Sequence, residues 1–139
     1  LARLTGIEPY VSGAFYRREL RCLLSVVPTL DRLGFSETEA IFVDGYTDLG
    51  PEHPGLGHHL YDRLHGLVPV IGVAKTRYAD ATAVEVVRHG TRPLYITSVG
   101  MRPEEAAERV LALPGDFRIP DLLRRADRLA RGGLLPPLT

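Results

Sequence analysis

The stretch Ile41-Phe42-Val43-Asp44-Gly45 decides how the rest of the chain is interpreted. Its first three residues are β-branched or aromatic, and such residues favour strands. Because no polar residue interrupts the run, it suits a buried strand of a mostly parallel sheet. The run ends at an Asp-Gly pair. We therefore expect a strand over 41–43 that places the Asp44 carboxylate at its carboxyl end.

Segments with helical and strand-like patterns alternate around this stretch. Apolar residues at helical spacing predict helices over 15–33, with Pro28 inside, over 56–67 and over 119–131, and Pro103 favours another helix start. The helix over 56–67 is expected to place Leu56, Leu60, Leu64 and Leu67 on one side. Further strands are predicted over 68–74, 83–87 and 94–98, the last two separated by a turn at Gly90-Thr91. This alternation predicts one α/β domain over 1–139, with a sheet flanked by helices.

Polar residues stand at or just past the ends of three predicted strands. They are Asp44, Lys75 and Ser98. In open α/β sheets the crevice beyond the carboxyl ends of the strands is where ligands bind. We therefore expect these three side chains to lie near one another at a working edge.

The composition is that of an ordinary globular protein. The 139 residues fit one compact domain. Seventeen basic and seventeen acidic residues balance, so there is no overall basic surplus of the kind typical of non-specific nucleic-acid binding, although a local basic patch would suffice. Cys22 is the one cysteine, which excludes an internal disulfide and favours a reducing, cytoplasmic location. No apolar run is long enough to span a membrane.

Four residues could carry chemistry: Glu19, Asp44, His53 and Lys75. Two carboxylates together could hold Mg²⁺, which takes oxygen ligands. A metal held in this way polarises a phosphate oxygen and lowers the pKa of an attacking water. A lysine nearby could neutralise charge on phosphoryl oxygens, and a histidine could relay a proton.

Each of these residues also has a plain structural interpretation. Glu19 could be a charged helix residue exposed to solvent, and Asp44 could be a turn residue. His53 could be an exposed loop residue without a function. Lys75 could simply be the polar residue that ends a strand. The triplet His58, His59 and His65 resembles a metal cluster, but His59 does not share the helical face of the other two. Walker-type phosphate loops, nucleophile elbows and zinc ribbons are absent from the sequence.

Several segments taken in order resemble the endonuclease V (deoxyinosine 3′ endonuclease) family. They occur at near-family spacing and cover nearly the whole chain. The matching segments are Pro9-Tyr10-Val11-Ser12-Gly13 with Arg18-Glu19, Phe42-Val43-Asp44-Gly45, His53-Pro54 with Leu56-Gly57 and His59-Leu60, Val68-Pro69-Val70-Ile71-Gly72-Val73-Ala74-Lys75, Pro93-Leu94-Tyr95-Ile96, and Arg118-Ile119-Pro120 with Ala126-Asp127.

The resemblance implies a ribonuclease H-like mixed sheet flanked by helices, reduced at the N-terminus. It also implies an Mg²⁺- or Mn²⁺-dependent hydrolase that cuts the second phosphodiester bond 3′ of a deaminated purine such as inosine, in DNA or RNA. By position, Glu19 and Asp44 would be the metal carboxylates, with His53 and Lys75 assisting at the phosphate. The substrate-binding residues would be Tyr10 and Ser12 in the strand-separating wedge and Gly13 and Gly45 beside the extruded base.

The chain departs from the family pattern at several points. A leading strand with a third metal Asp normally lies well upstream of the Tyr motif, whereas nine residues precede Tyr10 here and none is Asp. The usual Gly-His after the later strand reads Gly100-Met101. The loop after Asp44 is longer than usual, and Ser12 replaces the common Pro of the wedge.

These departures leave alternatives open. The protein could be an active nuclease, or a degenerate or repurposed homologue that binds nucleic acid or acts on a small nucleoside-like or other metabolite, or a structural domain without a site. The chain could be a fragment, its fold could be pared down, or a second copy could complete the sheet in a homodimer.

Overall fold

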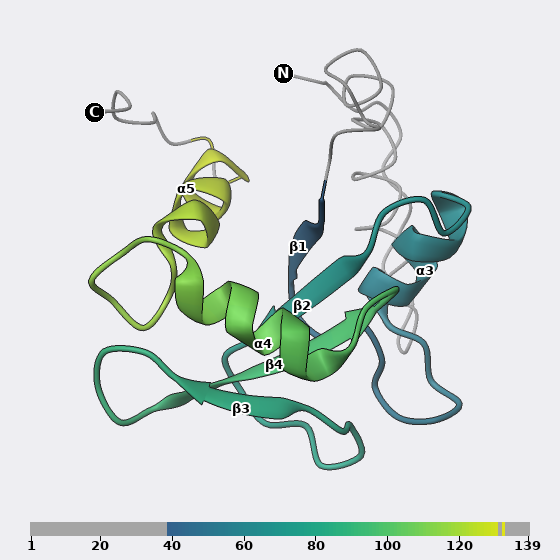
Figure 1. Ribbon diagram of the computed structural model, residues 1–139, viewed down its shortest axis with the longest axis horizontal. Helices are drawn as coiled ribbons and strands as arrows, with labels where there is room; N and C mark the ends of the chain where they lie inside the picture. The colour runs from purple at the N-terminus through teal and green to yellow at the C-terminus, as the bar shows by residue number, and fades with distance from the viewer. Residues whose placement is uncertain (1–38, 131, 133–139) are drawn as a thin grey trace.

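The computed structural model describes residues 39–130 and 132, and builds them around a four-stranded sheet (Figure 1). In chain order the elements are β1 (Ile41–Asp44), α3 (Leu56–Arg63), β2 (Val70–Ala74), β3 (Val84–Val87), β4 (Pro93–Val99), α4 (Pro103–Ala112) and α5 (Asp121–Ala130). Each lies where the sequence predicts an element of that type. The helix predicted over 15–33 lies outside the described residues.

The sheet is mixed, with the strand order β1-β2-β4-β3. β1 and β2 run parallel, while β4 is antiparallel to both β2 and β3. The predicted mixed sheet is therefore confirmed, and the expectation of mostly parallel pairing is wrong for the described strands. The short connection between β3 and β4 explains part of the difference, because adjacent strands joined by a tight turn must run antiparallel.

Helices cover both faces of the sheet, as Figure 1 shows. On one face, Ile71 and Val73 of β2 form a core with the inner residues of α4, Ala106, Ala107 and Val110. Val70 points to the other face and packs with Leu60 of α3 and with Leu64, which follows that helix. The faces alternate along β2 because successive side chains of a strand point in opposite directions. All five β2 residues are buried, as the uninterrupted apolar run predicts.

The helix after the first loop is shorter than the leucine spacing predicts. Leu60 and Leu64 are buried, but Leu67 is 71% exposed. The helix ends because His65 and Gly66 take positive φ angles of 56° and 67°, which turn the chain before Leu67 can reach the core. Of the helices in the described part of the chain, none has the length and apolar character needed to cross a membrane.

Candidate functional site

Asp44 and Lys75 lie side by side at one end of the sheet. Asp44 is the last residue of β1, and Lys75 directly follows β2, its parallel neighbour. The Gly45 amide continues the pairing by donating to the Val73 carbonyl at 3.0 Å. The Lys75 Nζ stands 3.5 Å from Asp44 Oδ2. Both side chains remain open to solvent, 44% exposed for the lysine and 61% for the aspartate.

Gly45 leaves open space at this corner of the sheet. Its φ of +135° is one that side-chain-bearing residues rarely adopt, and an added Cβ would meet no atom within 4 Å. The glycine therefore permits the sharp turn after Asp44 and leaves the space beside its Cα open. Its predicted place beside an extruded base stays a prediction.

His53 lies in the loop that leaves β1 and has no bond to the Asp44–Lys75 pair. Its amide donates to the Gly50 carbonyl, and its carbonyl accepts from the Leu49 amide at 2.7 Å. These bonds close a tight turn beside the bridge between Asp48 and Pro54. No hydrogen bond or ion pair joins the exposed His53 to Asp44 or Lys75. Tyr10, Ser12, Gly13 and Glu19 lie outside the described residues.

Ser98 does not join Asp44 and Lys75, so its predicted place at the same edge is wrong. β4 runs antiparallel to β2, and its register pairs Ser98 with Ile71, near the start of β2. The carboxyl end of β4 therefore lies at the opposite end of the sheet. Met101 follows that end, packs against the apolar core and accepts a hydrogen bond from the Ser98 hydroxyl at its carbonyl, 2.7 Å away.

Tyr46 is a residue whose importance the sequence did not indicate. Its hydroxyl donates to the Thr76 carbonyl at 2.7 Å and accepts from the Tyr78 amide at 2.9 Å. It thereby joins the segment after β1 to the segment after β2, directly beyond Asp44 and Lys75. Burial raises the pKa of the Tyr46 hydroxyl above its ordinary value of 10.0, which keeps the hydroxyl protonated and able to donate.

Thr47 anchors the rest of the loop after β1. It is fully buried, and its amide donates to the Thr97 hydroxyl of β4 at 2.9 Å. Its carbonyl accepts from the amides of Gly55 and His58, at 2.8 and 3.2 Å. Gly57 packs so tightly on Thr47 that an added Cβ would stand 2.6 Å from its methyl group. These contacts hold the loop against the sheet and fix the start of α3.

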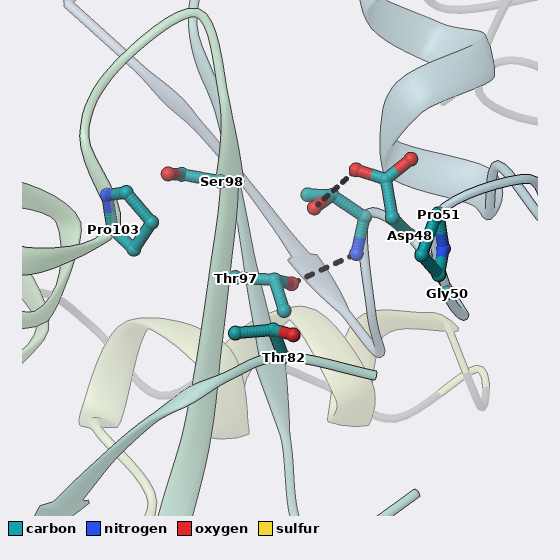
Figure 2. A pocket seen from close by; sticks show the side chains of 8 residues that line it. Asp48, Gly50, Pro51, Thr82, Thr97, Ser98 and Pro103 are labelled. Atoms are coloured by element: carbon teal, nitrogen blue, oxygen red, sulfur yellow. Dashed lines mark hydrogen bonds between the residues drawn. The ribbon is translucent and has the colours of Figure 1, made fainter. Parts of the chain in front are cut away.

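A hollow of about 370 Å³ lies beside this loop rather than beside Asp44. Figure 2 shows β4 passing between Pro103 on one side and Asp48, Gly50 and Pro51 on the other. Thr47, Thr82, Thr97 and Ser98 contribute hydroxyl groups to its lining. Asp44, His53 and Lys75 do not line it, so the hollow and the strand-end pair are separate features.

His58, His59 and His65 do not form the metal cluster that their spacing resembles. His58 Nδ1 lies 2.8 Å from Asp48 Oδ1, which ties the helix to the loop, and its Nε2 lies 3.7 Å from Asp62 Oδ2. Burial, together with the neighbouring His58, lowers the pKa of His59 below its ordinary value of 6.5. Among the described residues, no group of three His, Cys, Asp or Glu side chains could hold a metal ion.

The Asp44 carboxylate fits a hydrated hard cation better than a closed zinc site. Mg²⁺ usually keeps several waters and takes one or two carboxylates from the protein. The exposed Asp44 carboxylate can supply one such oxygen ligand, whereas a closed zinc site needs about four protein ligands. Lys75 stands where it can also face an anionic ligand of that cation.

The chain is similar in sequence to proteins named endonuclease V. It is 36% identical to the endonuclease V of Streptomyces avermitilis over 149 aligned residues, which cover 91% of this chain and 62% of that relative. This chain therefore spans about three fifths of the length of that relative. No family model matches the sequence.

The fold is similar to solved endonuclease V structures. The catalytic domain of human endonuclease V matches with a TM-score of 0.69 and 28% identity, over 90% of this chain and 64% of that one. Endonuclease V of Ciona intestinalis, in complex with a 23mer DNA containing an inosine followed by a ribo-adenosine, matches in fold with a TM-score of 0.68. It is 18% identical, and the match covers 90% of this chain and 66% of that one. The predicted ribonuclease H-like α/β fold is thereby confirmed.

Proposed function

This chain is a relative of endonuclease V in sequence and in fold, and we propose that it acts as a metal-dependent nuclease of that type. The bond cleaved is a phosphodiester near a deaminated purine, inosine above all, in DNA or RNA. The activity belongs to nucleic-acid repair in the cytoplasm, a location that the single cysteine favours. The observation that supports the proposal most is the pairing of Asp44 with Lys75 at the carboxyl ends of β1 and β2.

The proposed chemistry divides between these residues. Asp44, with Glu19, would hold Mg²⁺ or Mn²⁺, and such an ion when bound would supply Lewis-acid activation of the phosphate and of water. Lys75 would place its ammonium group against the phosphoryl oxygens and offset their developing charge. The open space beside the Gly45 Cα would leave room for a base drawn out of the strand. His53 would assist from the adjoining loop.

A test compares metal-dependent nicking by the wild type and by Asp44→Asn. An inosine-containing oligonucleotide is incubated with each protein and Mg²⁺ or Mn²⁺, and the products are resolved on a denaturing gel. Asp116→Asn is the matched control, because Asp116 is exposed and lies in the α4–α5 connection. The proposal expects nicking by the wild type and the control, and a loss of at least about a hundredfold in Asp44→Asn. Equal nicking by all three proteins would show that Asp44 takes no part in cleavage.

A second function, nucleic-acid binding without cleavage, has one observation in its favour. Among the described residues, Asp44 is the one carboxylate that the structure brings into contact with Lys75. A single carboxylate holds a catalytic cation weakly unless further ligands join it. Under this alternative the oligonucleotide binds to the wild type, but no metal-dependent nick forms.

We also propose that a second copy completes the sheet. In the described part of the chain, β1 pairs on one side only, with β2. An unpaired strand edge presents free amide and carbonyl groups that readily accept another strand. Sedimentation at increasing protein concentration tests this arrangement: a dimer is expected, and a clean monomer would count against it.

A further inference from the structure

The segment that follows β2 presents two cations and an aromatic ring on a fixed backbone. Lys75, Arg77 and Tyr78 are all exposed, and the Tyr78 side chain retains 44% of its accessible surface. Exposed segments are usually mobile, but the two bonds of the Tyr46 hydroxyl hold this one at Thr76 and Tyr78. The Tyr46 and Tyr78 rings lie 6.2 Å apart and tilted, so one side of the Tyr78 ring is supported.

The β3–β4 turn is fastened next to this segment. One guanidinium nitrogen of Arg118 donates to the Lys75 carbonyl at 2.6 Å and to the Pro93 carbonyl at 2.7 Å. That shared donor joins the end of β2 to the start of β4. The exposed His89 and Arg92 lie in the turn just before Pro93. Figure 1 shows this turn at the same end of the molecule as the α4–α5 connection that carries Arg118.

Two arginines on the helices are held in ion pairs, whereas those of this surface are not. Arg109 of α4 lies 3.3 Å from Glu39, and Arg124 of α5 lies 3.9 Å from Asp121. Within residues 39–130, Arg77 and Arg92 form no ion pair. Acidic residues do border them, at Asp44, Asp80 and Glu85, but none is paired with either arginine. The exposed arginines therefore keep their capacity to bind an anion, although the net charge of the chain is zero.

From this arrangement we propose that Arg77, Tyr78, His89 and Arg92, here called the basic rim, bind single-stranded nucleic acid beside Asp44. The inference rests on the proposed function, because it names where the substrate strand runs at that site. Unpaired guanidinium groups bind phosphates, and an exposed aromatic ring stacks on an unpaired base. A duplex keeps its bases stacked internally, so the combination favours a single strand.

The first test measures binding in EDTA, so that cleavage does not interfere. Fluorescence anisotropy follows a labelled single-stranded oligonucleotide with the full chain between about 50 and 200 mM salt. Arg77→Gln/Arg92→Gln is compared with Arg63→Gln/Arg102→Gln, a control that removes the same charge from α3 and from the residue before α4, where both side chains are exposed. The basic-rim variant should lower the slope of log affinity against log salt by about 1.4, or 0.7 per lost phosphate contact, and the control should not.

The second test asks whether the Tyr78 ring stacks on a base. Tyr78→Ala should weaken single-strand binding about tenfold with an unchanged salt slope, because stacking is not an ionic contact. Tyr78→Phe keeps the ring and should bind as the wild type does. Circular dichroism shows that each variant is folded before binding is compared. A duplex of the same sequence should bind more weakly and respond less to Tyr78→Ala.

The outcomes separate this inference from the nuclease proposal. If both double variants lower affinity and salt slope alike, or if the wild type does not bind a single strand, the basic rim is not a binding surface, even when Asp44-dependent nicking is found. If the basic-rim variant alone lowers the slope, the surface is established, even when no protein nicks the strand.

Discussion

At the scale of single residues, Thr47 and Thr97 determine where the first loop lies. The Thr47 amide is buried and has the Thr97 hydroxyl as its acceptor, from a strand fifty residues later in the chain. A buried amide that loses its acceptor costs about 1–3 kcal/mol. The contact therefore matters more for stability than the exposed Asp44–Lys75 pair, since exposed ion pairs contribute about 1 kcal/mol or less.

Replacement of Thr97 tests this bond. Thr97→Val keeps the shape and removes the acceptor, and we expect it to lower the free energy of unfolding by about 1–3 kcal/mol. Thr97→Ser is the control, because it keeps the hydroxyl and loses one methyl group, worth about 0.8 kcal/mol. Urea unfolding of both variants checks the expectation. A valine variant as stable as the wild type would show that the bond contributes nothing.

Gly72 leaves the space in which the loop rests on β2. A Cβ there would stand 2.4 Å from the Gly45 carbonyl oxygen, 2.5 Å from the Thr97 hydroxyl and 2.9 Å from the Thr47 amide nitrogen. Two of these three atoms belong to the backbone and cannot rotate away.

Gly72→Ala should consequently destabilise the protein by about 2–3 kcal/mol through overpacking. Val87→Ile adds a methyl group at a β3 position that is 54% exposed, and it should change stability by less than about 0.5 kcal/mol. Thermal unfolding compares the two variants. If Gly72→Ala has the same melting temperature as the wild type, the loop does not rest on β2 as described.

At the scale of elements, Tyr46 connects the ends of β1 and β2. Tyr46→Phe removes both hydroxyl bonds and should cost about 1 kcal/mol at neutral pH. The raised pKa means that the folded state favours the neutral hydroxyl. This contribution is complete below the ordinary value of 10.0 and is lost as the pH rises through the folded-state pKa.

The difference in unfolding free energy between wild type and Tyr46→Phe should therefore narrow above pH 10.0. Urea titrations of the two proteins at neutral pH and at a pH above that value measure it. Because the other tyrosines ionise equally in both proteins, their effect cancels in the comparison. A difference that stays constant or widens would contradict the assigned hydrogen bonds.

The same scale shows what local sequence can and cannot predict. The segments of the described strands and helices were predictable from apolar runs, from helical spacing and, for α4, from Pro103 at its start, and the run before Asp44 correctly placed it at a strand end. The direction of each strand was not predictable, because an apolar run has the same pattern whether its neighbour is parallel or antiparallel. That is why Ser98 was grouped with Asp44 although the antiparallel register separates them. The prediction that Leu67 lies on the inner side of the helix was wrong, because the backbone turns at His65 and Gly66 before the helical period reaches it.

At the scale of the whole molecule, three contacts that could not be predicted from the sequence join distant segments. Tyr46 to Thr76, Thr47 to Thr97 and Arg118 to Lys75 each link residues at least thirty positions apart. Local patterns carry no information on such pairs, since they depend on the packed sheet. The Asp44–Lys75 pair was predictable only because parallel neighbouring strands end at the same edge.

Our central proposal, supported by the likeness to endonuclease V and by the strand-end pair, is that Asp44 serves cleavage at a deaminated purine. The most direct measurement maps the cut on an oligonucleotide with one inosine, against the same strand carrying guanine, in the presence of Mn²⁺. We predict a nick at the second phosphodiester bond 3′ of inosine, with no nick in the guanine strand and none when Asp44→Asn replaces the wild type. Cutting at unrelated positions, or equally with guanine, would contradict it.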